Sequence, residues 1–105
     1  MPPISKIERL PIIQHGDLSI DLQCYIVSFG GEEIHLFPKE FEILCLLVQH
    51  PNWVLSVKQI YENVWQEELI GDGHTVCNAI YQIRHKLGRP GIIRTVVGYG
   101  YKFVP

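Results

Sequence analysis

The stretch 74–87 constrains the fold of this 105-residue chain more than any other segment. Four apolar residues recur there at the spacing of one helical face, namely Val76, Ile80, Ile83 and Leu87. An amphipathic helix of this kind is stable only when its apolar stripe packs on other elements. We therefore expect a helix over 74–87 with one buried face, ending at Gly88 in the position of a left-handed C-cap.

The opposite side of the same stretch carries an unusual set of polar groups. At 100° per residue, five hydrogen-bonding side chains fall within about 100° of arc, namely His74, Asn78, Tyr81, Gln82 and His85. A solvated helix face more often carries paired Glu and Lys residues. Amide, imidazole and phenol groups favour contact with a polar surface, and an ordinary solvated face is the alternative.

Short strands are predicted before the first helix. Apolar residues alternate from Leu18 to Leu22 and from Tyr25 to Phe29, and a Gly-Gly turn leads into 32–36. A further strand is expected near 10–13, within a leader or linker end over 1–16. Residues 17–105 then form one domain, since about 100 residues suit a single core.

Two more helices and a hairpin complete the pattern. Pro38 favours the start of a helix that runs to Gln49, although Phe37 before it offers no side-chain cap. Ser56, with Gln59 three residues on, predicts a capping box for a second helix. Residues 92–97 and 101–104 flank Gly98-Tyr99-Gly100 and predict a β-hairpin. The chain is thus expected to be an α+β protein.

Charge is divided unevenly along the chain. Residues 1–73 hold 4 basic residues against 11 acids, a balance of −7, whereas residues 74–105 hold 5 basic residues and no acid. The net charge of −2 therefore conceals a basic C-terminal third. Such asymmetry favours a nucleic-acid partner over a solvated basic face without a partner.

Composition also excludes several classes. No apolar run approaches the roughly 20 residues of a membrane span, and no signal peptide opens the chain, so a cytoplasmic location is expected. The three cysteines, Cys24, Cys45 and Cys77, suit a reducing compartment and are expected to be buried or half-buried free thiols. The glycines at 98 and 100 lack a third glycine and a following helix, and the five histidines are scattered. We expect no enzyme activity, no catalytic residue, no metal and no cofactor.

Four segments together carry a family resemblance, in order and with similar spacing: 36–49, Val64-Trp65, 83–88 and 93–101. Over residues 18–104 the chain resembles the output domains of bacterial response regulators of the OmpR/PhoB type. The resemblance implies a winged helix-turn-helix with a small N-terminal antiparallel sheet, three helices and a C-terminal β-hairpin wing.

The same resemblance implies partners. Double-stranded DNA would receive the third helix in its major groove and the wing near its minor groove, for sequence-specific transcription regulation in a two-component system. The loop 66–73, with Glu67, Glu68 and Leu69, would face RNA polymerase. A receiver domain would belong to a longer parent chain, and the isolated domain would be a monomer that binds DNA as a head-to-tail pair.

Site residues divide into two groups. Asn78, Tyr81, Gln82 and His85 are predicted to read base edges. By resemblance, Arg84 and Thr95 match phosphate-holding positions, and Trp65 and Tyr101 match other backbone-contacting positions. His74 and Arg94 complete the predicted set of DNA-backbone contacts.

Several positions depart from the family pattern. Phe37 stands where a Thr is usual, Cys77 replaces an acid, Tyr81 and Gln82 replace an arginine pair, and Val97 replaces a wing arginine. Each missing cation removes one phosphate or groove attraction, so we expect weaker and less salt-dependent binding than is typical. The alternative is a winged-helix protein-interaction module with weak or no DNA binding.

Overall fold

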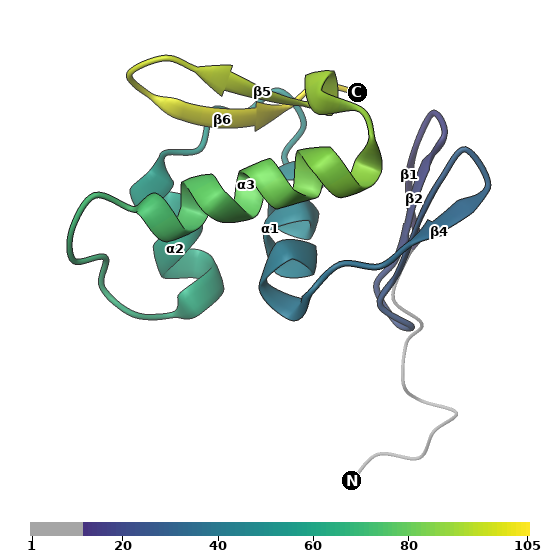
Figure 1. The fold of residues 1–105 in the computed structure, drawn as a ribbon, viewed down its shortest axis with the longest axis horizontal. Helices are drawn as coiled ribbons and strands as arrows, with labels where there is room; N and C mark the ends of the chain where they lie inside the picture. The colour runs from purple at the N-terminus through teal and green to yellow at the C-terminus, as the bar shows by residue number, and fades with distance from the viewer. Residues whose placement is uncertain (1–11) are drawn as a thin grey trace, which may run out of the picture.

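The structure, a computed structural model, describes residues 12–105. Four strands come first: β1 (Ile12–His15), β2 (Leu18–Asp21), β3 (Ile26–Phe29) and β4 (Glu32–Ile34). Three helices follow, α1 (Pro38–Val48), α2 (Val57–Trp65) and α3 (His74–Leu87), and the chain ends with β5 (Ile93–Val96) and β6 (Gly100–Phe103). Figure 1 shows α3 lying across α1 and α2, with the β5–β6 hairpin along one side of it. The predicted α+β winged-helix architecture is confirmed.

The N-terminal sheet is an antiparallel meander in the order β1-β2-β3-β4. The strand expected near 10–13 is present as β1, although residues 10 and 11 lie outside the described part of the chain. The division into a leader over 1–16 and a domain over 17–105 remains a prediction. Alternation is confirmed in β2, where Leu18 and Ile20 are buried.

The prediction that Tyr25 begins a strand was wrong. Asp21 Oδ1 accepts hydrogen bonds from the backbone N–H groups of Gln23 and Cys24, at 2.9 and 3.1 Å. This side-chain turn places Tyr25 at φ +58°, outside the extended region, and leaves its ring exposed. The strand therefore begins one residue later, at Ile26.

The helix termini follow the local chemistry. Ser56 caps α2 through its hydroxyl, which accepts from Gln59 N at 3.0 Å, while the Gln59 side chain accepts from Ser56 N at 2.8 Å. In α1, Phe37 supplies no side-chain cap, but Glu40 Oε1 accepts from Phe37 N at 2.9 Å. Half of a capping box thus remains where the Thr of the family is missing. Gly88 ends α3 at φ +69°, as its position predicted.

A short 3₁₀ helix, η2 (Pro90–Ile92), connects α3 to the hairpin. The strands β5 and β6 pair with Thr95 opposite Tyr101. Leu55, in the loop between α1 and α2, joins β6 as an isolated bridge through two 2.9 Å backbone hydrogen bonds with Tyr101. Leu55 thus pairs with the outer edge of β6 and attaches the hairpin to the body of the domain.

The hydrophobic core lies where the sheet, the helices and the hairpin meet. All four residues of the predicted α3 stripe are buried in it, together with apolar residues of α1 and α2 and with Ile93 and Phe103 of the hairpin. No helix within residues 12–105 is long and apolar enough to cross a bilayer.

Of the cysteines, only Cys45 meets the expectation of burial. Cys24 lies in the exposed turn after β2, and Cys77 lies on an exposed flank of α3, so the prediction was wrong for both. Burial raises the pKa of the Cys45 thiol to about 12, with a smaller contribution from the nearby Glu42 carboxylate.

Candidate nucleic-acid interface

The polar face of α3 is open to solvent along its whole length. Asn78, Tyr81, Gln82 and His85 are all exposed, whereas the opposite stripe is buried. The rings of Tyr81 and His85 are nearly parallel, with centroids 6.3 Å apart, so these side chains lie along one ridge. Because the core holds the apolar stripe, the orientation of this polar face is determined by packing rather than by the polar groups themselves.

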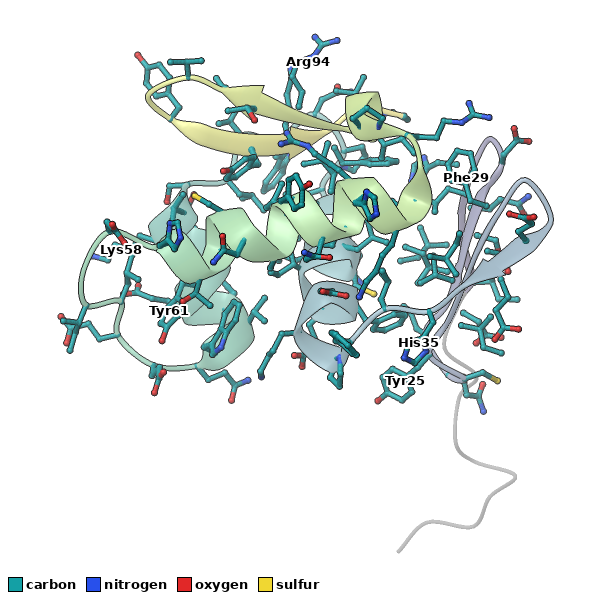
Figure 2. The ribbon with its side chains drawn as sticks, viewed as in Figure 1. Tyr25, Phe29, His35, Lys58, Tyr61 and Arg94 are labelled. Carbon is teal, nitrogen blue, oxygen red and sulfur yellow. The ribbon has the colours of Figure 1, made fainter. Side chains whose placement is uncertain are left out.

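The wing presents a second exposed surface beside α3. Its tip carries Val97 and Tyr99, whose side chains are 87% and 74% exposed. Arg94, near the root of the hairpin, is exposed and projects away from it in Figure 2. Within residues 12–105 no hydrogen bond or ion pair holds the Arg94 guanidinium. The wing thus offers an apolar tip and an exposed arginine that is free of hydrogen bonds and ion pairs within the described residues.

Arg84 lies between α3 and the wing and is only half-buried. Its Nε donates to Ile93 O at 3.0 Å, and its Nη2 donates to Ile93 O at 2.7 Å and to Thr95 Oγ1 at 2.8 Å. Its Cζ lies 5.6 Å from the centroid of the Tyr101 ring. Three residues predicted to contact the DNA backbone, Arg84, Thr95 and Tyr101, therefore contact one another in the free domain.

The Tyr101 hydroxyl is directed to the flank of α3, where it donates to Cys77 Sγ at 3.3 Å. Burial and this hydrogen bond raise the pKa of Tyr101 to about 12, while the charge of Arg84 opposes the change. The phenol is therefore neutral throughout the physiological pH range and is available as a hydrogen-bond donor to Cys77.

The basic C-terminal third contributes less free charge than its sequence indicates. Besides Arg84, Lys86 is paired with the buried carboxylate of Glu40 at 2.6 Å, and the Arg89 guanidinium lies 5.0 Å from the Phe29 ring. Among the five cations of residues 74–105, only Arg94 and the half-buried Lys102 lack a hydrogen bond, ion pair or ring contact within the described chain.

Lys58, which sequence reasoning missed, adds a cation from a distant part of the chain. It is exposed near the N-terminus of α2 (Figure 2). It lines a shallow hollow together with Thr95 and Tyr99 of the wing. No local pattern signals this role, because the hairpin and the start of α2 meet only in the folded domain.

Trp65, at the end of α2, is packed rather than free. Its ring stacks on Tyr61 at 4.9 Å, with 9° between the ring planes, and Lys39 Nζ lies 5.9 Å from its centroid. Tyr61 in turn donates to Glu67 Oε1 at 2.6 Å, which raises the pKa of its phenol. His74 is exposed at the first position of α3, where its backbone N–H donates to Asp72 Oδ1 at 3.0 Å.

The loop between α2 and α3 exposes Glu67 and Glu68, and its contact with RNA polymerase remains a prediction. Leu69 is half-buried, and its N–H donates to Glu62 Oε2 at 3.2 Å. The outward apolar residue of the loop is Ile70, which is 89% exposed. Sequence reasoning did not select Ile70, because period and composition do not indicate which of two adjacent apolar residues points outward in a loop.

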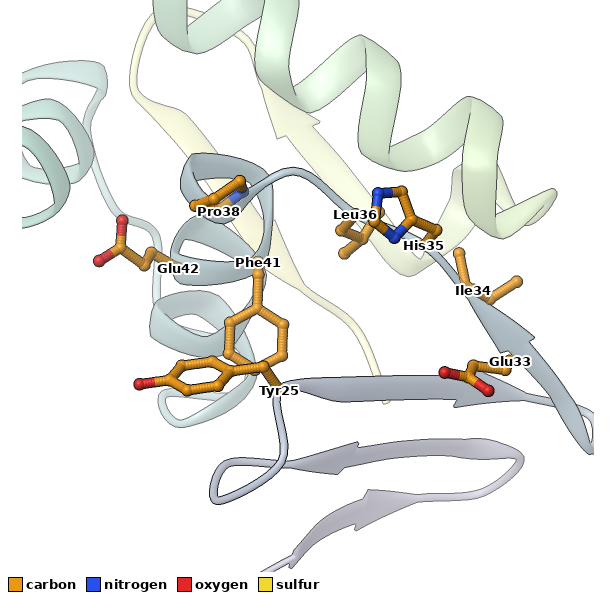
Figure 3. Close-up of a pocket in the computed structure, with 8 residues that line it drawn as sticks. All are labelled: Tyr25, Glu33, Ile34, His35, Leu36, Pro38, Phe41 and Glu42. Carbon is orange, nitrogen blue, oxygen red and sulfur yellow. The ribbon is translucent and has the colours of Figure 1, made fainter.

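A hollow of the described surface lies elsewhere, between the N-terminal sheet and the start of α1 (Figure 3). There the rings of Tyr25 and Phe41 meet edge to face at 5.3 Å, with Glu33 and Glu42 at the rim. No group of three or more His, Cys, Asp or Glu residues within 12–105 is placed to hold a metal ion.

A polar exposed helix, two helices that support it and a hairpin beside it define a winged helix-turn-helix domain. The family described as "Transcriptional regulatory protein, C terminal" matches residues 31–103, and this chain belongs to it. Transcriptional regulatory protein SrrA of Staphylococcus aureus is 37% identical in an alignment of 97 residues that covers 88% of this chain and 40% of SrrA. The chain thus spans well under half the length of that relative.

Two solved structures share the fold closely. The RstA DNA-binding domain of Klebsiella pneumoniae, crystallised in complex with the RstA box, is 30% identical with a TM-score of 0.84, covering 91% of this chain and 99% of that one. The response regulator DrrB of Thermotoga maritima, described as an OmpR/PhoB homologue, is 33% identical with a TM-score of 0.79, covering 90% of this chain and 44% of DrrB.

Proposed function

We propose that this chain binds double-stranded DNA and regulates transcription as the output domain of a two-component response regulator. The observation that carries the proposal is the orientation of α3, whose buried apolar stripe leaves four neutral hydrogen-bonding side chains exposed beside the wing. An α-helix with its side chains is about 10–12 Å across and fits the major groove, about 12 Å wide. Family membership and the DNA complex of RstA support the same function.

Base reading is assigned to Asn78, Tyr81, Gln82 and His85. A carboxamide pairs bidentately with the N6 and N7 edge of adenine, which suits Asn78 and Gln82. Tyr81 and His85 add a phenol and an imidazole on the same ridge. The absence of Lys and Arg among these four positions favours recognition through neutral hydrogen bonds over the arginine-to-guanine contact.

DNA-backbone contact is assigned first to Arg94, which is exposed on the wing, and to Lys58, which lines the shallow hollow between the start of α2 and the wing. Trp65 and His74 remain proposed donors to phosphate oxygens at the other end of α3. With two free cations assigned to phosphate contact, we expect a salt slope of roughly −2, since each neutralised phosphate contributes about −0.9.

The test is selection of a binding site from a randomised duplex pool, followed by fluorescence anisotropy at low and moderate salt. We expect the selected duplex to bind at least about 10³-fold tighter than a mixed-sequence duplex. Failure to bind any duplex even at about 50 mM salt, where phosphate attraction is strongest, would overturn the proposal.

In the parent protein we propose a receiver domain before this domain and RNA polymerase as the partner of the 66–73 loop, through Glu67, Glu68 and Leu69 together with the exposed Ile70. The isolated domain is proposed to be a monomer that binds DNA as a head-to-tail pair, with half-sites one helical turn, about 10 bp, apart. Sedimentation of the free domain tests the first statement. Duplexes with 10 and 15 bp between half-site centres test the second, because the longer spacing places the two sites on opposite faces of the DNA.

A second candidate function is protein binding by the wing without DNA, which the apolar tip formed by Val97 and Tyr99 favours. The same anisotropy experiment separates the two functions. Under this alternative, the domain binds no duplex at low salt. The Val97→Arg variant, which adds a cation to the wing, binds none either.

A further inference from the structure

We infer that Arg84 is a positioning residue, whose guanidinium holds the wing in a set orientation against α3. The inference concerns how the proposed reading helix and wing act together, so it rests on the proposed function. Its physical basis lies in contacts that the free domain already makes.

Arg84 is bound to β5 through two acceptors. Its Nε and Nη2 groups both donate to Ile93 O, and Nη2 also donates to Thr95 Oγ1, at 2.7 to 3.0 Å. The acceptors come from residues two apart on the same strand, which a planar fork of fixed N–H directions can reach together. A lysine ammonium carries its donors on a single atom and cannot reproduce this geometry.

The same side chain also contacts β6. Its Cζ lies 5.6 Å from the Tyr101 ring, and Tyr101 is paired directly with Thr95 in the hairpin. One guanidinium therefore contacts both strands of the wing at the same level. Tyr101 is itself fixed, because its backbone pairs with Leu55 and its hydroxyl donates to Cys77.

Cys77 and Arg84 are seven residues apart on α3, so they lie on one line of the helix almost two full turns apart. Tyr101 contacts both of them. The wing thus meets α3 along one flank, next to the polar ridge rather than on it. This arrangement sets the distance and angle between the two surfaces proposed to contact DNA.

Phosphate binding through the Nε–Nη2 edge would compete with these contacts, which leave only Nη1 for another acceptor. The Nε–Nη2 edge, one of the two edges that bind an oxyanion bidentately, is occupied by Ile93 O. Turning that edge toward DNA would break three hydrogen bonds and leave the Ile93 carbonyl without the Arg84 donors. Arg94 has no such partner within residues 12–105 and is the matched control, since it is an exposed arginine one residue from Thr95.

The first experiment uses the domain without DNA. Arg84→Ala should raise the equilibrium constant for unfolding in urea about tenfold, as expected when charged hydrogen bonds are lost. Thr95→Val, which removes the acceptor and retains the shape, should have a smaller effect, and none when added to Arg84→Ala. Hydrogen exchange of β5 and β6 amides should be about tenfold faster in Arg84→Ala and unchanged in Arg94→Ala.

The second experiment uses a duplex selected from a randomised pool by the unmodified domain. Arg84→Ala should weaken binding to this duplex about tenfold, and Arg94→Ala should flatten the salt slope by about 0.9. Arg84→Lys should not restore affinity, because it restores charge without the fork. At equal occupancy, the hydroxyl-radical footprint of Arg84→Ala should lose protection at the wing end and keep it along α3, whereas general destabilisation would leave the footprint unchanged.

Additive effects of Arg84→Ala and Thr95→Val on unfolding would overturn the inference. So would full recovery of affinity in Arg84→Lys. If the unmodified domain bound no duplex, the proposed function would fail, and the coupling between Arg84 and Thr95 in the free domain would still decide whether the two residues hold the wing.

Discussion

Lys86 Nζ lies 2.6 Å from Glu40 Oε1, which joins the last turn of α3 to the first turn of α1. The Glu40 side chain is nearly inaccessible to solvent, and the same oxygen accepts from Phe37 N at 2.9 Å. Lys86 also lies 4.0 Å above the Phe37 ring. Lys86 belongs to the basic C-terminal third that the sequence associates with DNA binding, but its ammonium group is paired with a buried carboxylate of α1.

We predict that Lys86→Met lowers the free energy of unfolding by about 2–3 kcal/mol, because it leaves a buried carboxylate without its counter-charge. Adding Glu40→Gln should recover most of the loss. Urea unfolding measures the free energy of unfolding of the single and the double variant. Glu42→Gln, which removes the exposed Lys39–Glu42 pair at 3.3 Å, is the control and should change stability by less than about 1 kcal/mol. Equal effects of Lys86→Met and Glu42→Gln would contradict the prediction.

Gly100 is predicted to be intolerant of any side chain. A Cβ on this residue, at φ +153°, would overlap the Leu55 carbonyl oxygen, so either the bridge between Leu55 and Tyr101 or the hairpin must shift. Gly100→Ala should lower the thermal midpoint by more than about 5 °C, as expected for an unfavourable change above roughly 1 kcal/mol in a domain of this size. Gly91→Ala is the control, since a Cβ there meets nothing within 4 Å and φ is ordinary. Equal thermal midpoints for the two variants would contradict the predicted overlap with Leu55.

The three thiols should differ in reactivity. The thiolate is the nucleophile, and burial raises the pKa of Cys45 to about 12, so Cys45 is both shielded and protonated at pH 8. We expect Cys24 and Cys77 to react with a disulfide reagent in the native domain and Cys45 only after unfolding in guanidinium. Absorbance of the released thiol counts the groups, with Cys45→Ala as the control. Rapid reaction of Cys45 without denaturant would show that this part of α1 opens.

Substitutions in the proposed interface should separate the recognition of base edges from the electrostatic attraction to phosphates. Gln82→Ala should reduce discrimination between the selected duplex and its single-base variants by about 1–3 kcal/mol at one base pair. Its effect on a mixed-sequence duplex should be small, since no charge is removed. Arg94→Ala should weaken both duplexes alike. Competition anisotropy measures the difference, and uniform weakening by Gln82→Ala would remove Gln82 from the reading face.

Local signals in the sequence were enough for the helices of this domain. The 3.6-residue period of the α3 stripe, the Ser56–Gln59 capping box and the glycine at 88 each act within a few residues, and the structure has each of them in place. The strand prediction was wrong at Tyr25 because the apolar alternation of the sequence continues through a turn that the Asp21 side chain creates. A side-chain turn of this kind competes with the strand period and is not part of it.

The sequence by itself determined which face of α3 is polar and which is buried, because helical geometry assigns every residue of 74–87 an angle once the stripe is recognised. Only the tertiary structure decided which cations are free. Arg84 and Lys86 carry the same formal charge as Arg94, yet their partners, Ile93 and Glu40, are set by how the hairpin and α1 pack on α3. Charge can be counted along a chain, but its availability depends on contacts between segments far apart in sequence, as Lys58 beside the wing also illustrates.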